Sequence, residues 1–163
     1  MFETSDYEQR QQQKALEHFI TVQSKRARQG SIFVPSQYAV IIQDGKYRIF
    51  STWNQGKSSG IVMEITLQLQ GNFLETSDMV FCGAVAIEYE DGKLLAHAQN
   101  PQQLRLLVSQ GALFNYKRAT VYVNPVDASS DTLYGNNSYE NTIKTLGLDL
   151  NVVPVNDTDL IVI

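Results

Sequence analysis

Only a few stretches of this sequence combine residue types that do chemistry. The run GAVAIEYEDGKLLAHAQNP, residues 83–101, holds Glu88 and Glu90 two positions apart and His97 near its end. Two carboxylates at that spacing lie on one face of a strand and form a candidate catalytic pair. Because Asp91-Gly92 is a strong hairpin signal, we interpret Glu90 as part of a hairpin end and His97 as a polar residue at the end of the second strand.

A Gly-Lys-Ser run at residues 56–58 matches the end of a phosphate-binding loop. The full pattern, G-x-x-x-x-G-K-[ST], also needs a glycine at position 51, where this chain has Ser51, and a helix directly after the loop. Residues 61–70, IVMEITLQLQ, instead alternate between apolar and polar side chains, which predicts a strand. We therefore interpret the run as a hairpin tip and not as a nucleotide site.

Metal ligands are scarce in this chain. Cys82 is the single cysteine, His18 and His97 are the two histidines, and no H-x-x-H or H-x-x-x-H spacing occurs. Zinc sites draw on several Cys and His side chains. We therefore predict that the protein holds no zinc and no cofactor and that His97 is not a metal ligand. Cys82 lies in the apolar run MVFCGAVAI, which predicts a buried thiol.

The hydrophobic pattern predicts the elements that position these residues. Apolar spacing, turn residues and caps indicate helices over 6–28, 101–114 and 138–146, hairpins over 38–50 and 83–98, strands over 61–70, 119–123, 150–155 and 160–163, and a turn over 71–78. This order predicts one α+β domain over residues 1–163, a mainly antiparallel β-meander sheet with an N-terminal helix and two C-terminal helices packed on it.

The two predicted hairpins resemble each other, since AVIIQDGKYRIFSTWNQ and AVAIEYEDGKLLAHAQNP share an Asp-Gly-Lys turn. From the strand and helix faces we expect ten aliphatic residues to be largely buried: Val40, Ile42, Ile65, Leu67, Val85, Ile87, Leu107, Val121, Val123 and Val153.

The N-terminal helix has an uneven pattern. Leu16, Phe19, Ile20 and Val22 form one narrow apolar stripe in its second half, whereas the first half, EQRQQQK, has no apolar face. A helix segment that is polar all round is either solvated or in need of a partner, so residues 1–30 are a candidate partner-binding arm. The basic run at 25–28, KRAR, either complements the helix dipole or contacts nucleic acid.

Composition narrows the function classes. The chain has 163 residues, 43% of them hydrophobic and 18% charged, with a formal net charge of -4. An acidic balance disfavours binding to nucleic acid or to an anionic membrane. The N-terminal residues lack the apolar core of a signal peptide, and no apolar run approaches the ~20 residues of a membrane span. We expect a cytoplasmic protein, or for a viral protein one in the host cytoplasm or the virion.

In outline the chain resembles the cytidine deaminase superfamily. The N-terminal helix, the first hairpin, Asn54 after it and GIVMEIT at 60–66 follow the order of that family's elements, and Glu64 stands where the family has its proton-shuttling glutamate. Val62, however, stands in place of a zinc ligand, and Gln102 and Arg105 in place of the two cysteine ligands.

A second register of the same resemblance places His97-Ala98-Gln99 on the family's H-A-E motif and residues 125–129, PVDAS, on its P-C-x-x-C motif. Both registers lose the ligands that hold the water-activating zinc ion. The resemblance therefore implies a non-catalytic relative, a pseudoenzyme that deaminates neither cytidine nor adenosine.

These observations favour a non-enzymatic protein-binding or assembly protein, of the kind found among viral or mobile-element structural factors, inhibitors and immunity proteins. Its expected partner is another protein or a second copy of the chain. The alternative is a small-ligand binding protein or an enzyme with a degenerate deaminase-like fold, which would bind a nucleoside or nucleotide. Its cleft would be lined by Trp53, Asn54, Glu64 and Tyr134.

Overall fold

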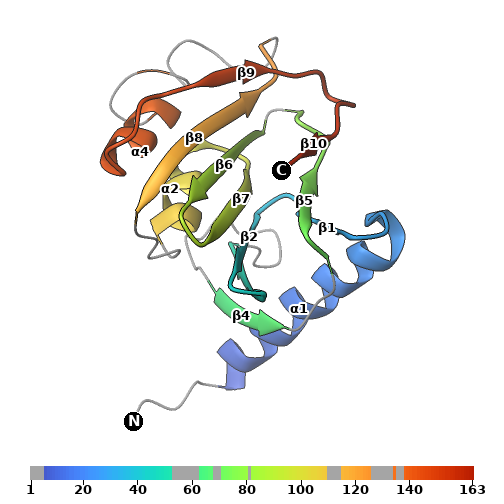
Figure 1. Ribbon diagram of the computed structural model, residues 1–163. Coiled ribbons are helices and arrows are strands. Elements are labelled where there is room, and N and C mark those ends of the chain that lie inside the picture. Colours follow the sequence, from blue (N-terminus) through green and yellow to red (C-terminus); the bar gives the residue numbers. More distant parts are fainter. Residues whose placement is uncertain are drawn as a thin grey trace.

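Two sheets and three helices make up the described part of the chain (Figure 1). This computed structural model describes residues 6–52, 71–80, 82–109, 115–125, 134 and 138–163, and the backbone of 63–67. The helices are α1 (Asp6–Arg26), α2 (Pro101–Ser109) and α4 (Tyr139–Thr145). The strands are β1 (Ser31–Phe33), β2 (Tyr38–Gln43), β3 (Lys46–Ser51), β4 (Met63–Leu67), β5 (Phe73–Thr76), β6 (Gly83–Tyr89), β7 (Gly92–Ala98), β8 (Tyr116–Val123), β9 (Val152–Pro154) and β10 (Ile161–Val162).

The main sheet has seven strands in the order β4-β3-β2-β7-β6-β8-β9. All neighbours in it are antiparallel except β8 and β9. Its centre consists of the two hairpins that resemble each other in sequence, β2–β3 and β6–β7. They lie side by side because β2 pairs with β7, so the second hairpin repeats the first one along the sheet.

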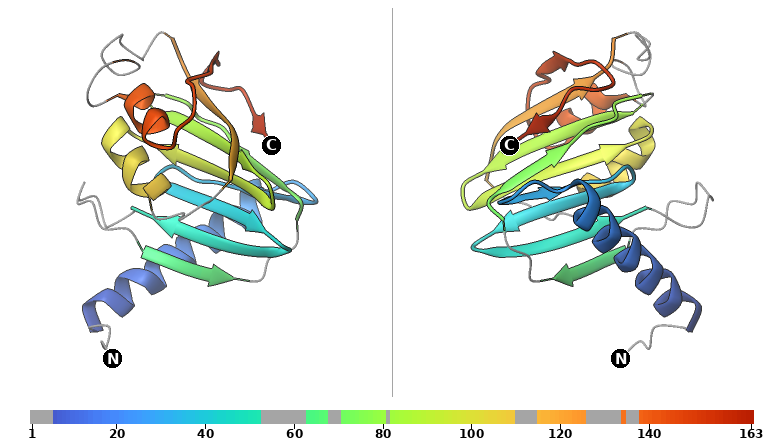
Figure 2. Two further views of the ribbon diagram at one scale, coloured as in Figure 1. Left: turned by 60° about the vertical axis from the view of Figure 1, so that its left-hand side comes forward. Right: turned by 90° about the vertical axis from the view of Figure 1, so that its right-hand side faces the viewer.

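The helices α2 and α4 cover one face of the main sheet (Figure 2). Ser138 caps α4, since its side chain accepts a hydrogen bond from the backbone N–H of Asn141, and Gly147 ends the helix at a φ of +75°. The helix-side core buries residues from both helices and from five strands: Ala39, Ile41, Phe50, Val85, Ile87, Tyr89, Leu94, Ala96, Ala98, Leu104, Leu107, Val108, Ala119, Val121, Val123, Tyr139 and Ile143.

The other face carries α1 and the second sheet, which has three strands in the order β1-β5-β10. We call α1 and this small sheet the cover layer. Between it and the main sheet lies the cover-side core: Phe19, Ile32, Val34, Tyr38, Val40, Tyr47, Ile49, Leu74, Met79, Ala84, Ala86, Leu95, Val155 and Ile161. The molecule is thus three layers deep, with the main sheet in the middle.

The α+β fold and its element order are confirmed, including the strand at residues 63–67 and the two C-terminal strands. The turn predicted over 71–78 is wrong in part, because Phe73–Thr76 form β5, the central strand of the small sheet. Phe73–Thr76 stand between two pairs of turn-forming residues, Gly-Asn and Ser-Asp. A run of only four residues is too short to show the alternation that predicts a strand. The partners of β5 come from the distant β1 and β10.

Most of the predicted core is confirmed. Six of the ten residues are buried: Val40, Val85, Ile87, Leu107, Val121 and Val123. Ile42, near the end of β2, and Val153, on the edge strand β9, are only partly buried. The side chains of Ile65 and Leu67 lie outside the described residues. The prediction that Cys82 is buried is wrong in part, because the residue is only partly buried. Its Sγ lies 3.9 Å from the hydroxyl oxygen of Ser36.

The apolar stripe predicted on α1 is wrong at Ile20, which is 48% exposed. The helix instead buries Gln11, Ala15 and Phe19, which lie four residues apart and therefore on one face. It ends at Arg26, two residues before the predicted end, because the backbone N–H of Arg28 bonds the carboxylate of Glu75. The N-terminal end of α1 extends past β4 (Figures 1 and 2), and the side chains of Asp6, Tyr7, Gln9 and Arg10 are exposed.

Candidate protein-binding surface

The residues that the sequence suggested for a ligand cleft are not brought together in the described part of the chain. Trp53 and Asn54 lie outside the described residues. Glu64 lies on the edge strand β4, opposite Phe50 of β3, and its side chain is not described. Tyr134 is 49% exposed. The ligand-binding alternative and these lining residues therefore stay predictions.

No group of three His, Cys, Asp or Glu side chains gathers as a metal site among the residues that the structure describes. Gln102 and Arg105, which replace the deaminase cysteines in one register, are both exposed on α2, and Arg105 bonds the side chain of Asn141 at 2.6 Å. Glu64 lies on a strand. The kinship with deaminases remains a hypothesis.

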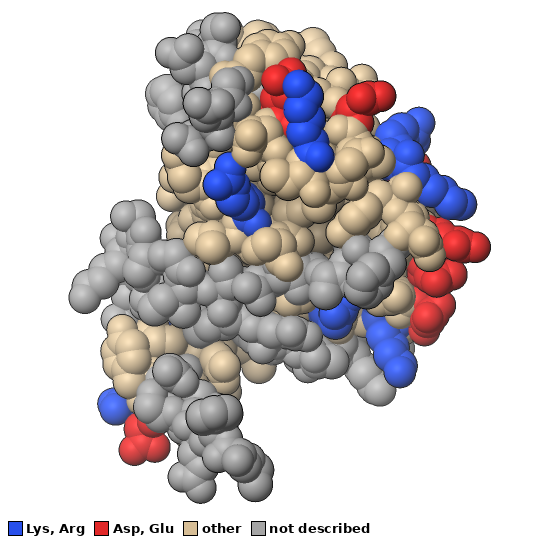
Figure 3. Space-filling view, turned by 90° about the vertical axis from the view of Figure 1, so that its left-hand side faces the viewer, with Lys and Arg blue, Asp and Glu red and all other residues tan. Residues whose placement is uncertain are grey.

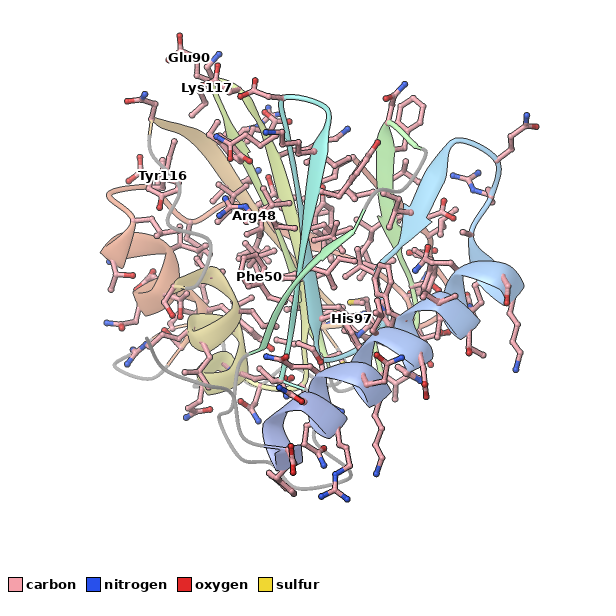
Figure 4. The ribbon with its side chains drawn as sticks, turned by 90° about the horizontal axis from the view of Figure 1, so that it is seen from below. Arg48, Phe50, Glu90, His97, Tyr116 and Lys117 are labelled. Atoms are coloured by element: carbon pink, nitrogen blue, oxygen red, sulfur yellow. The ribbon has the colours of Figure 1, made fainter. Side chains whose placement is uncertain are left out.

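His97 is 1% exposed and lies on the side of the main sheet that faces α1 and β5, opposite to Arg48 and Phe50 (Figure 4). Its Nδ1 lies 2.7 Å from the hydroxyl oxygen of Thr76 on β5. The same hydroxyl donates to the carbonyl oxygen of Val34 at 2.7 Å. A hydroxyl has one proton, so Thr76 accepts from His97, and Nδ1 of the imidazole carries a proton.

The second ring nitrogen of His97, Nε2, is buried and has no hydrogen-bond partner. In this tautomer it carries a lone pair, which a dry site tolerates far better than a charge. Burial lowers the pKa of His97 to about 4, with Asp78 raising it and Arg26 lowering it by smaller amounts. His97 is therefore a neutral link between the two sheets at neutral pH.

Two ion pairs hold the C-terminal end of α1 against the small sheet. Arg26 pairs with Asp78, bonds the hydroxyl of Ser77 at 2.8 Å, and places its guanidinium 4.4 Å from the ring centre of Phe33. Arg28 bonds the carboxylate of Glu75 through its side chain at 2.7 Å, and Glu75 is 1% exposed. Arg26 and Arg28 of the basic run therefore make contacts within the chain.

The edge of β1 is closed by a side chain of α1. The amide of Gln23 donates to the carbonyl oxygen of Phe33 at 2.6 Å and accepts from the N–H of Phe33 at 2.8 Å. The N–H and C=O of successive residues in a strand point to opposite sides. Because the N–H of Val34 donates to the carbonyl oxygen of Glu75 on β5, the N–H and C=O of Phe33 point away from β5. Gln23 thus occupies the place that a neighbouring strand would take.

Removing this edge closure should have a measurable cost. We expect Gln23→Ala to lower the free energy of unfolding by about 1–2 kcal/mol, because two partly buried backbone groups lose their partner. Gln13→Ala on the exposed face of the same helix, where the amide bonds Glu17 at 3.2 Å, should cost less than about 0.5 kcal/mol. Urea denaturation measures both. Equal losses in the two variants would contradict the edge-closing role of Gln23.

The edge of β9 is closed differently. Pro154 has no backbone N–H, and it lies between Val153, which pairs with Tyr122 of β8, and Val155, whose N–H bonds Val123. The missing N–H therefore falls on the outer side of the edge strand, where a proline blocks the addition of a further strand.

The edge of β10 is open in the described part of the chain. Ile161 and Ile163 face β5, since Ile163 exchanges both backbone hydrogen bonds with Leu74, so the N–H and C=O of Val162 point outward. Val162 is 43% exposed and stands opposite Glu75, and Phe73, two positions further along β5 on the same face, is 52% exposed. Lys93 lies 5.4 Å from the centre of the Phe73 ring. We call Phe73, Val162 and this strand edge the β10 surface.

Sequence reasoning missed Gln23, Thr76 and the β10 surface. A glutamine-rich helix sequence predicts solvent exposure, and nothing local marks one of the five glutamine side chains of α1 as the one that meets a strand. Thr76 and Phe73 lie in the segment interpreted as a turn. An alternating Phe-Leu-Glu-Thr pattern was the one available signal for β5.

The face over α2 and α4 offers a different kind of surface. Figure 3 shows basic and acidic side chains together on this side of the molecule. On α4, Lys144 pairs with Glu140 at 3.3 Å, and on the opposite face of the main sheet Arg118 pairs with Glu88 at 3.0 Å. Charges that neutralise each other in pairs are a poor footprint for nucleic acid, which needs a basic field.

No helix among the described residues is long and apolar enough to cross a membrane. Comparison with protein-family models, with curated proteins and with solved structures finds no match for this chain.

Proposed function

We propose that this is a non-enzymatic protein-binding or assembly protein that docks another protein chain on the β10 surface. The observation that carries the proposal is the open edge of β10 beside half-exposed Phe73 and Val162, in a molecule whose β1 and β9 edges are closed. Natural proteins generally protect edge strands, so an edge left open beside exposed apolar side chains is a place where a partner gains affinity.

The chemistry of the β10 surface favours a protein over other partners. Outward N–H and C=O groups of Val162 match an extended backbone, and Phe73 and Val162 match apolar side chains at alternate positions of such a strand. The net charge of -4 and the paired surface cations are unfavourable for a nucleic acid. Assembly factors, inhibitors and immunity proteins all act through contacts of this kind, and we place the protein in the cytoplasm, or in the virion for a viral protein.

The test is a charge placed at the centre of the surface. The wild-type protein at micromolar concentration should form a dimer or a complex with its partner in light scattering and native mass spectrometry. Val162→Lys should weaken that association at least about tenfold, because a buried ammonium group without a partner is costly. Ile20→Lys, an equally exposed apolar residue on α1, is the matched control and should leave the association unchanged.

Two results would contradict the proposal. One is a wild-type protein that stays monomeric and purifies from its natural source without a partner. The other is an association that Val162→Lys leaves intact or that Ile20→Lys weakens equally, because binding would then occur elsewhere or without regard to the surface.

A further inference from the structure

Both histidines of the chain lie between the cover layer and the main sheet. His97 is on β7 and bonds Thr76 of β5, and His18 on α1 stacks on Tyr38 of β2 with ring centres 5.7 Å apart. The helix-side core on the other face of the sheet contains neither of them. A change in histidine charge therefore acts on one of the two interfaces of the main sheet.

Protonation of His97 is incompatible with the closed interface. The added proton would sit on Nε2, which is buried and has no acceptor within hydrogen-bond distance. Its strand neighbours are Ala84 of β6, which has no polar side-chain atom, and Tyr38 of β2, whose hydroxyl donates to the carbonyl oxygen of Ala15 and is not bonded to Nε2. A buried imidazolium without a counter-ion is strongly disfavoured.

The charged groups around His97 do not compensate this cost. Asp78, which follows β5, is paired with Arg26 of α1, and Glu75 of β5 is paired with Arg28. The pKa of His97 is correspondingly low, with burial as the main cause, and burial also lowers the pKa of His18. Water would have to reach Nε2 before the ring could take up a proton.

We propose that protonation of His97 detaches the cover layer from the main sheet, while α2 and α4 keep their places on the other face. The link that holds the ring in place runs from His97 on the main sheet to Thr76 and Val34 of the cover layer, so opening this interface would release the ring and let water reach Nε2. The opened form would expose the cover-side core, including Tyr38, Val40 and Leu95. It is an acid-sensitive release built into the fold.

The direction with pH follows from linkage. In the opened form the imidazole regains its ordinary pKa near 6.5, and in the closed form the value is about 4. The opened form therefore binds more protons between these values, and the closed form loses stability as pH falls from about 6.5 to about 4. At pH of about 4.5 the equilibrium constant for opening should be on the order of 50-fold to 100-fold larger than at neutral pH.

Hydrogen exchange read by mass spectrometry on the full chain tests the proposal, with rates corrected for intrinsic exchange at each pH. Amides of β1, β5 and the C-terminal half of α1 should lose protection by that factor at pH of about 4.5, whereas those of β6 and β8 should change less than about threefold. Uniform protection down to this pH, or equal loss in all strands, would overturn the proposal.

His97→Asn is the decisive variant, because the Asn amide can donate to Thr76 from nearly the place of Nδ1 and cannot take up a proton. It should shift the loss of cover-layer protection to lower pH by at least about one unit, whereas His18→Gln, the matched control, should shift it far less. An unchanged transition in His97→Asn overturns the proposal.

If His97→Asn does not fold, nitrogen NMR of the wild-type imidazoles decides. The proposal requires the proton on Nδ1 at neutral pH and protonation of Nε2 together with the loss of β5 protection. Protonation of His97 near pH 6.5 without that loss contradicts it.

Discussion

Replacing Gly92 by alanine should lower the free energy of unfolding by at least about 3 kcal/mol, enough to leave much of the protein unfolded. A Cβ atom at this position would lie 1.9 Å from the carbonyl oxygen of Ile42 and 2.9 Å from the Tyr89 hydroxyl. The oxygen belongs to the backbone of β2, which pairs with β7 through this same position, Gln43 opposite Gly92. The two hairpins could accept the methyl group only by separating.

The chain supplies a matched control in its other hairpin. Gly45 lies in the same Asp-Gly-Lys sequence, but a Cβ there would meet nothing within 4 Å. Its φ of +72° is the only obstacle to a side chain, so Gly45→Ala should cost about 1 kcal/mol. Thermal and urea denaturation compare the two variants. A Gly92→Ala protein as stable as Gly45→Ala would mean that β2 and β7 are not in this close register.

Arg28→Ala should produce the second large loss, about 2–3 kcal/mol of unfolding free energy. The variant leaves the carboxylate of Glu75, which is 1% exposed, without its guanidinium partner, and an unpaired buried charge is costly. The remaining backbone N–H of residue 28 compensates part of the loss. Because the same pair ties α1 to the small sheet, exchange of amides in β5 should rise as well.

Arg118→Ala is the control for this prediction. Arg118 and Glu88 pair at 3.0 Å, but their side chains are 66% and 48% exposed, so the loss should stay below about 0.5 kcal/mol. The double variant Arg28→Ala/Glu75→Gln should regain at least about 1 kcal/mol over Arg28→Ala, since it removes the buried charge. Equal stabilities of Arg28→Ala and Arg118→Ala in urea denaturation would contradict the assignment of Glu75 as a buried, paired carboxylate.

Local sequence patterns were sufficient to predict the hairpins and helices, whose defining contacts join residues that are close in sequence. The Asp-Gly turns predicted both hairpins, Pro101 and Ser138 marked the starts of two helices, and the β run at 119–123 predicted the burial of Val121 and Val123. These features depend on contacts within a few positions, and residue types report them directly. The α+β class followed from the same patterns.

The small sheet and the β10 surface could not be predicted this way. β1, β5 and β10 are two to four residues long, and their pairing joins residues 31–33, 73–76 and 161–162. Short strands show no reliable period, and the hydrogen bonds that create them come from distant parts of the chain. The exposure of Phe73 and Val162 is a property of the assembled sheet, and no sequence motif predicts it.

By itself the sequence determined that two Asp-Gly-Lys hairpins form, that few groups able to bind a metal are present, and that His97 ends a strand. The tertiary structure alone decided what those residues do. It made Gly45 a turn residue and Gly92 a site of backbone contact, because β2 pairs with β7. It also made His97 a buried link to Thr76, because β5 is laid over β7 from 21 positions away. Pairing across such separations depends on the packing of whole layers, which no local stretch encodes.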